Sequence, residues 1–239
     1  MKAAKPFVFK QFTVEQDKCA LKVNTDAVLL GALAEKNDPA NILDIGAGTG
    51  VISLMLAQRF PKAIIHSVEI EPNAFLQAQQ NFNDGPWADR MEIFHLPFQE
   101  LHQTHGYKYD LIVSNPPYYT DHLKTRHQER NIALHGLSLT FEELAAGVRE
   151  ALSEQGTFYA ILPERQMEQL VQCFQKLGMY AGTKVNVLDR PGAPILRVIR
   201  AFGSSPPTTS VDKEIIIKDA ARNYSSDYAS LLKDFLLIF

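Results

Sequence analysis

The sequence is poor in the residue types that mark secreted, membrane-spanning or metal-binding proteins. Its 239 residues include only two cysteines, Cys19 and Cys173, which lie too far apart to form a metal-ligand motif. Isolated cysteines of this kind are typical of reduced thiols in a cytoplasmic protein. No run of about 18 apolar residues is present, and no apolar stretch resembles a signal peptide. We therefore expect a cytoplasmic protein without a membrane span or a bound metal.

A large excess of positive charge is also missing. The formal net charge is −3, so any contact with RNA must come from local basic patches. The chain is 46% hydrophobic and 21% charged, which is typical of a soluble globular domain. Its length suits one α/β domain with modest additions. We expect a single domain over 1–239, with an N-terminal hairpin and helix at 1–37, a core at 38–204 and a C-terminal extension at 205–239.

One glycine-rich stretch organises the chain. An apolar run that contains Asp44 is followed by Gly46, Gly48 and Gly50, and then by an apolar helical pattern. This order predicts a strand, a tight turn and a helix. Glycines let the backbone approach a ligand without an intervening Cβ atom. The free N–H groups at the start of the helix can receive a polar ligand.

A second acidic residue supports a nucleotide site. Glu69 ends a predicted strand at 63–69 and lies 19 residues after Gly50, close to the roughly 20 expected for a ribose-binding acid. The glycine spacing differs from the dinucleotide fingerprint. The pattern instead resembles motif I of the methyltransferases that depend on S-adenosylmethionine (SAM). This resemblance implies SAM as the cofactor, held by Asp44, Gly46, Gly48, Gly50 and Glu69.

The alternation of strands and helices predicts an α/β fold with a doubly wound, mostly parallel, Rossmann-like sheet of seven strands. The 190–193 linker is short enough for a hairpin, so an antiparallel strand should lie near the C-terminus. A further strand is possible at 214–218. A small N-terminal hairpin is expected within 6–23, with its turn at 15–18. Asn24, Thr25 and Asp26 then offer capping groups for a helix, although this segment could instead fold over the cofactor.

A second motif, Asn115-Pro116-Pro117-Tyr118, directly follows a predicted strand at 107–114. It should lie at the carboxyl edge of the sheet, where ligands bind in this architecture. The motif resembles that of methyltransferases acting on planar amino groups, whose lone pair is delocalised into the ring. The Asn115 side-chain oxygen and the Pro116 carbonyl can accept hydrogen bonds from such a group. The prolines stiffen the loop, and Tyr118 can stack on the target ring.

Two sets of basic residues are candidate RNA contacts. Lys124, Arg126 and Arg130 follow the Asn115 motif, and Arg190 and Arg197 form a second possible rim. Either set could contact phosphates, or it could belong to a solvated loop. The sequence leaves these alternatives open.

Several segments together resemble one family, the bacterial tRNA(adenine-N(6))-methyltransferases that modify valine tRNA beside the anticodon. The resemblance covers essentially the whole chain and implies a tRNA substrate methylated at the adenine 3′ of the anticodon. It also implies cofactor contacts at Lys22, Thr25 and Phe98. An acid common near the cofactor adenine is replaced by Leu96-Pro97-Phe98, so apolar or backbone contacts must serve there. The segments that carry the resemblance are Phe9-Lys10-Gln11-Phe12, Lys22-Val23-x-Thr25-Asp26, Asp44-Ile45-Gly46, Asn115-Pro116-Pro117-Tyr118, Arg190-Pro191-Gly192 and 228–239.

Other functions share parts of this pattern. A glutamine-amide protein methyltransferase also uses the Asn115 motif, but it normally carries an additional N-terminal helical domain. A ribosomal RNA guanine methyltransferase is a further alternative. A SAM-fold RNA-binding module without turnover is disfavoured by the intact Asn115 and Tyr118. A monomer is favoured, although the sequence does not fix the oligomeric state.

Overall fold

The computed structural model describes residues 4–117, 139–207 and 212–239. Within these ranges the strands form one eight-stranded sheet and a separate two-stranded hairpin. The strands are β1 (Phe7–Val8), β2 (Thr13–Val14), β3 (Asn41–Ile45), β4 (Ile64–Val68), β5 (Met91–Phe94), β6 (Tyr109–Ser114), β7 (Leu152–Leu162), β8 (Tyr180–Leu188), β9 (Ile195–Gly203) and β10 (Asp212–Ile216).

The large sheet has the strand order β10-β8-β9-β7-β6-β3-β4-β5. Strand β9 runs antiparallel to both of its neighbours, and every other pair in this sheet is parallel. The predicted doubly wound sheet with an antiparallel strand near the C-terminus is therefore confirmed. Strand β10 extends the seven expected strands to eight because it pairs with the open edge of β8.

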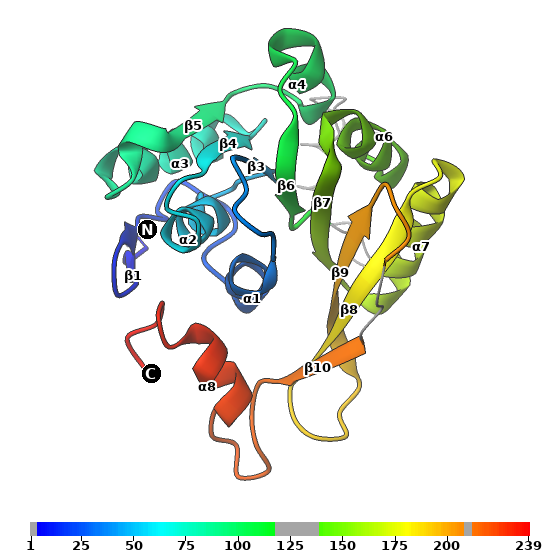
Figure 1. The fold of residues 1–239 in the computed structure, drawn as a ribbon. Helices are drawn as coiled ribbons and strands as arrows, with labels where there is room; N and C mark the ends of the chain where they lie inside the picture. The colour runs from blue at the N-terminus through cyan, green and yellow to red at the C-terminus, as the bar shows by residue number, and fades with distance from the viewer. Residues whose placement is uncertain (1–3, 118–138, 208–211) are drawn as a thin grey trace, which may run out of the picture.

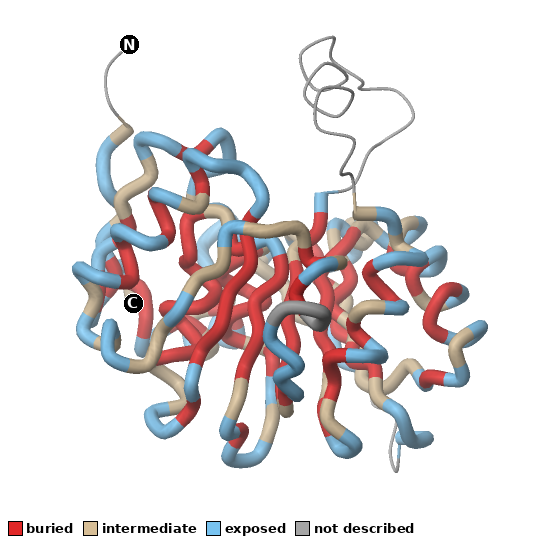
Figure 2. The backbone as a smooth tube through the Cα atoms, turned by 90° about the horizontal axis from the view of Figure 1, so that it is seen from above, coloured by how far each residue is buried: buried red, intermediate tan, exposed pale blue. Residues whose placement is uncertain are grey.

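Helices cover both faces of the sheet (Figure 1). One face carries α1, α2 and α3, and a hydrophobic cluster there also includes side chains of α8. The other face carries α4, α6 and α7 over a second cluster. Figure 2 shows the buried positions running along the central strands. Side chains of these strands enter both hydrophobic clusters, as expected for a parallel sheet that is covered on both faces. The helices are α1 (Thr25–Leu33), α2 (Val51–Arg59), α3 (Pro72–Asp84), η1 (Ala88–Arg90), α4 (Phe98–His105), α6 (Phe141–Ala151), α7 (Glu164–Lys176) and α8 (Ser226–Leu232).

The N-terminal hairpin is present, but its turn was predicted in the wrong place. The turn lies at 9–12, where the Phe9 N–H donates to the Phe12 carbonyl at 2.9 Å. The segment at 15–18 runs along α3 instead. There the N–H groups of Glu15 and Lys18 donate to the side chains of Asn81 and Gln77 at 2.9 and 2.8 Å. These buried amides replace the ladder partners that a longer hairpin would have supplied.

The two ends of the described chain meet beside the first hydrophobic cluster. The Lys10 N–H donates to the Phe235 carbonyl at 2.8 Å, and Phe9 forms an antiparallel bridge with Leu236. Figure 1 shows the segment after α8 returning toward the N-terminal hairpin. None of the helices in the described ranges is long and apolar enough to cross a membrane. Side chains of both extensions thus join the hydrophobic cluster on the face of the sheet that carries α1, α2 and α3.

Candidate cofactor and active site

The sheet register places three predicted site residues in one row. Ile45 of β3 pairs with Ser114 of β6, and it also pairs with the last residue of β4. The residues that follow, Asn115, Gly46 and Glu69, therefore leave the carboxyl ends of three adjacent strands together. The Ser114 hydroxyl donates to the Ile45 carbonyl at 2.9 Å, which fixes the end of β6 against β3. The structure thus brings the glycine loop, the strand-end acid and the Asn115 motif to one edge.

The glycine loop has two kinds of glycine. Gly46, Gly48 and Gly50 all have positive φ angles, of 75°, 57° and 80°, which side-chain-bearing residues rarely adopt. A Cβ atom built at Gly46 or Gly48 would meet no other atom within 4 Å, so these two glycines border open space. A Cβ atom at Gly50 would lie 2.5 Å from Cε1 of Phe82. Gly50 therefore allows α2 to pack closely on α3, and its predicted cofactor contact stays a prediction.

Glu69 holds the glycine loop from the neighbouring strand. One carboxylate oxygen accepts the Gly48 N–H at 2.9 Å, and the other accepts the Glu71 N–H at 2.8 Å. The residue is only 9% exposed. Each carboxylate oxygen has a second lone pair, so Glu69 can still accept hydrogen bonds from a ligand. Its predicted contact with the ribose stays a prediction.

Asp44 presents a buried carboxylate oxygen that has no hydrogen-bond partner in the described part of the chain. Its Oδ2 accepts a hydrogen bond from the Ser53 hydroxyl at 2.6 Å, whereas Oδ1 has no hydrogen-bond partner among the described residues. Burial raises the pKa of Asp44 to about 7 and the charge of Glu69 adds to this, although hydrogen bonds from the Ser53 side chain and backbone lower the pKa. An unsatisfied buried acceptor is costly, so a bound donor or cation would stabilise this oxygen. This oxygen and the open loop at Gly46 and Gly48 fit SAM, which carries both charged amino and sulfonium groups.

The N-terminal segment packs against this part of the site. Cys19 is buried, and burial followed by the charges of Glu69 and Glu71 raises the pKa of its thiol to about 11. Electrostatic interaction with both acids indicates that Cys19 lies near the end of β4. The Lys22 ammonium donates to the carbonyls of Cys19 and Gln16. Lys22 therefore stabilises the loop at 16–22 in this structure. Its predicted cofactor contact stays a prediction.

Helix α1 is capped by Asn24, one of the three predicted capping residues. The Asn24 side chain accepts the Ala27 N–H at 2.9 Å, which satisfies one of the free donors of the first turn. Thr25 begins the helix and is exposed. Asp26 accepts a hydrogen bond from Nε of Arg197 at 2.6 Å, with both side chains about a quarter exposed. Thus Asp26 ties α1 to β9 instead of capping its helix.

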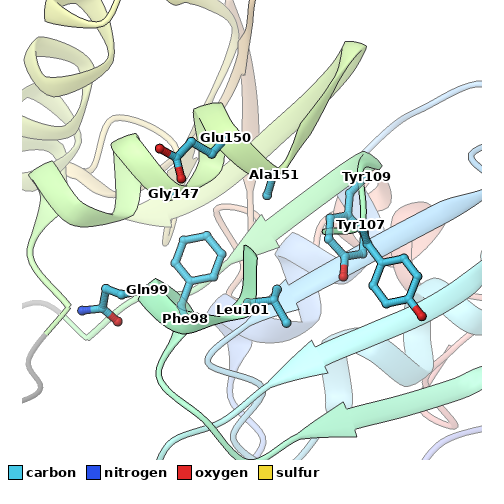
Figure 3. Close-up of a pocket in the computed structure, with 8 residues that line it drawn as sticks. All are labelled: Phe98, Gln99, Leu101, Tyr107, Tyr109, Gly147, Glu150 and Ala151. Atoms are coloured by element: carbon cyan, nitrogen blue, oxygen red, sulfur yellow. The ribbon is translucent and has the colours of Figure 1, made fainter. Parts of the chain in front are cut away.

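Phe98 lies in the second hydrophobic cluster (Figure 3). Its ring is 6% exposed, and a Cβ atom at Gly147 would lie 2.6 Å from its Cε1, so α4 and α6 pack closely here. It lines a cavity of about 20 Å³ together with Leu101 and Tyr109, which is space for about one water molecule. The ring is a core side chain. Leu96 and Pro97 are partly exposed, so apolar or backbone contacts from 96–98 to the cofactor adenine stay a prediction, as does the contact expected of Phe98.

The Asn115 motif is described for its first three residues. Asn115 is partly exposed, Pro116 is buried and Pro117 is exposed. Packing of Pro116 anchors the motif, while Asn115 keeps access to the edge of the sheet. Tyr118 lies outside the described residues, as do all three basic residues of the first candidate RNA set, Lys124, Arg126 and Arg130.

The second candidate RNA set lies at the same edge of the sheet. Val198 pairs with Leu162, the last residue of β7, so Arg197 lies just beyond the carboxyl end of that strand. Arg190 is exposed in the turn between β8 and β9, where its carbonyl accepts the Ala193 N–H at 3.1 Å. The structure therefore places Arg197 near the carboxyl edge of the sheet, where it forms an ion pair with Asp26.

Sequence reasoning did not select three buried polar residues that support the site. Ser53 and Ser67 hydrogen-bond to each other at 2.9 Å beneath the glycine loop. Asn81 of α3 donates to the carbonyls of Thr49 at 2.8 Å and Glu15 at 2.9 Å, joining the loop to the N-terminal segment. The sequence feature that could have identified them is a polar residue at a position of a helix or strand where an apolar residue is expected. Across the described ranges, no group of three potential metal-ligating side chains is present.

Solved structures show the same fold. The "predicted O-methyltransferase" of Agrobacterium tumefaciens aligns with a TM-score of 0.68 at 17% identity, covering 88% of this chain and 96% of that one. Pyrococcus horikoshii TYW2, solved in complex with MeSAdo, aligns with a TM-score of 0.58 at 14% identity, covering 86% and 73%. These likenesses show that the chain has the fold of these proteins, with its glycine loop after β3 and its acid after β4 at the carboxyl edge of the sheet.

Sequence comparison identifies the particular family. Residues 21–184 match the methyltransferase small domain. Proteins named tRNA1(Val) (adenine(37)-N6)-methyltransferase from Bacteroides fragilis and Pedobacter heparinus are each 40% identical, over 97% and 98% of both chains. The protein of that name from Serratia proteamaculans is 38% identical, over 98% of this chain and 90% of its own. The chain belongs to this family of methyltransferases, as its motifs predicted.

Proposed function

We propose that this protein transfers a methyl group from SAM to N6 of adenine 37 in tRNA1(Val). The observation that carries the proposal is similarity along the whole chain. Relatives with this named activity are about 40% identical over 97% of both sequences, so the alignment includes the N- and C-terminal extensions in addition to the SAM-binding core. A match confined to the core would have supported methyl transfer without indicating the substrate.

The Asn115 motif suits an exocyclic amine. The Asn115 side-chain oxygen and the Pro116 carbonyl can accept the two hydrogens of the adenine amino group. Such acceptors orient the nitrogen and stabilise the positive charge that develops on it. In other enzymes, removing one hydrogen bond to a developing charge lowers the rate by about 10²–10³, and we expect an effect of similar size here. The position of Asn115 beside the glycine loop supports this role.

Three groups of this chain are assigned to the cofactor, which supplies the methyl group. Glu69 is proposed to accept hydrogen bonds from the ribose hydroxyls. The backbone at Gly46 and Gly48 is proposed to border the cofactor, because both positions face open space. Asp44 is proposed to attract the positive charge of SAM through Oδ1, which has no partner among the residues that the structure describes.

RNA binding must rest on focused basic patches because the net charge is −3. We assign the first contact to the segment that follows the Asn115 motif. Replacing Arg126 and Arg130 with Ala should weaken tRNA binding and reduce the slope of log affinity against log salt by about one to two units. SAM affinity should stay unchanged. Identical slopes in filter-binding titrations would move the RNA to the rim at Arg190 and Arg197.

The decisive experiment is mass spectrometry of nucleosides from tRNA1(Val) transcripts incubated with SAM and the protein. One N6-methyladenosine per tRNA is expected, and a transcript with guanine at position 37 should receive none. Methylation that persists in this transcript would refute the site assignment. Methyl transfer to ribosomal RNA or a protein glutamine, with none to tRNA, would favour the alternative enzymes. SAM binding without transfer to any substrate would favour a binding module.

A further inference from the structure

Beneath the glycine loop, three polar side chains form a chain of hydrogen bonds inside an apolar environment. Asp44 and Ser67 pair in register on adjacent parallel strands, so their side chains lie on the same face of the sheet. Ser53 lies in the first turn of α2, which covers that face. Each of the three residues is fully buried.

The hydrogen bonds of Ser53 and Ser67 distinguish the two oxygens of the Asp44 carboxylate. The Ser53 hydroxyl has one hydrogen, which it gives to Oδ2 of Asp44 at 2.6 Å. The Ser67 hydroxyl lies 2.9 Å from the Ser53 oxygen, so it can donate to that oxygen. One carboxylate oxygen is thereby engaged within the protein. The other, Oδ1, is left without a partner among the described residues.

We propose that Ser53, supported by Ser67, is a positioning residue that orients Asp44 so that its free oxygen serves the cofactor. Hydrogen bonds from the Ser53 hydroxyl and backbone hold the carboxylate, while Oδ1 has no hydrogen-bond partner within the described ranges. The hydroxyl also favours the ionised form of the carboxyl group, which attracts a cationic ligand. Ser53 thus prepares the site without touching the cofactor. This inference depends on SAM being the cofactor and is independent of the RNA substrate.

The arrangement makes a specific prediction about pH. Burial raises the pKa of Asp44 to about 7, and among the described charged groups only Glu69 raises it further. If SAM binds the ionised form, affinity should increase as the pH rises through about 7. A group with that pKa is about one-tenth ionised one pH unit below it, so affinity should be about tenfold weaker at pH 6 than at pH 8. Removing the Ser53 hydroxyl should move this transition to higher pH.

The test is calorimetric titration with SAM from pH 5.5 to 9 on the parent, Ser53→Ala and Ser67→Ala. Ser53→Ala should weaken binding about 5- to 10-fold at pH 7 and recover toward parent affinity at pH 9. Ser67→Ala should give a smaller shift in the same direction. Ser153→Ala is the matched control, because Ser153 donates to Asp110 at 2.9 Å in another serine–aspartate pair. Its binding curve should superimpose on that of the parent.

A second measurement needs no cofactor. Carbon-13 NMR of the Asp44 carboxyl group should show a titration midpoint near 7, displaced upward by about one unit in Ser53→Ala. An unchanged midpoint would overturn the proposal, as would an affinity loss in Ser53→Ala that is equal at every pH. Parent affinity independent of pH would also overturn it. If the parent does not bind SAM, both the cofactor assignment and the proposed role of Ser53 are wrong. If the protein methylates a substrate other than tRNA, the proposed role of Ser53 is unaffected.

Discussion

Replacing Glu69 separates its two roles, because its carboxylate holds the backbone and is expected to hold the cofactor ribose. In Glu69→Ala the N–H groups of Gly48 and Glu71 lose their acceptors, which lie at 2.9 and 2.8 Å. In Glu69→Gln one of these acceptors remains, and the other is replaced by an NH2 group. The two variants therefore change the loop and the ligand contact to different extents.

Hydrogen bonds to a charged group contribute about 1.5–3 kcal/mol each. Loss of the ribose contact should thus lower SAM affinity by about 10- to 150-fold in Glu69→Ala. At about 1–3 kcal/mol for each unsatisfied donor, the two N–H groups should also lower the free energy of unfolding of the cofactor-free protein by about 2–6 kcal/mol. Glu69→Gln should lose about half of each, because it keeps one oxygen.

Isothermal calorimetry with SAM and urea unfolding measure these two quantities on the same samples. Glu71→Gln is the control, because Glu71 is an exposed residue that caps α3 and leaves the strand-end position unchanged. Its SAM affinity should stay within about twofold of the parent. Unchanged affinity in Glu69→Ala would refute the ribose assignment. A loss of stability alone would leave Glu69 with only its role in holding the loop.

Three further predictions follow from the site. Asn115→Ala should keep SAM affinity near that of the parent but lower kcat on saturating tRNA by about 10²–10³, and a variant with more than half the parent turnover would contradict its role. Gly50→Ala should destabilise the protein in urea unfolding by about 2 kcal/mol or more, since φ is 80° and the new Cβ would lie 2.5 Å from Phe82; parent stability would refute that packing argument. Asn81→Ala should cost about 3 kcal/mol, because three hydrogen bonds are lost. Gln80→Ala, on the exposed face of the same helix, should cost less than about 1 kcal/mol in the same unfolding experiment, and equal losses would contradict the assignment of Asn81.

Local patterns in the sequence determined the class of fold and the principal site. Each of these patterns can be recognised within a short segment. They are the alternation of apolar strands and helices, the glycines after the first core strand and the acid after the next strand. In a doubly wound sheet such strand ends meet at one edge, so Gly46, Glu69 and Asn115 could be placed together before the structure was known. The short 190–193 linker likewise required the β8–β9 hairpin.

Tertiary structure decided which polar groups find each other across long distances in the chain. Asn81 lies 66 residues from Glu15, and its hydrogen bonds hold the 15–18 segment on α3 although the local sequence there predicts a turn. Ser53 lies nine residues from Asp44, on a different element, so its role depends on how α2 packs over β3. Phe98 enters the core because Gly147 leaves room for its ring. These partnerships depend on packing between elements, and periodicity within one element does not contain that information.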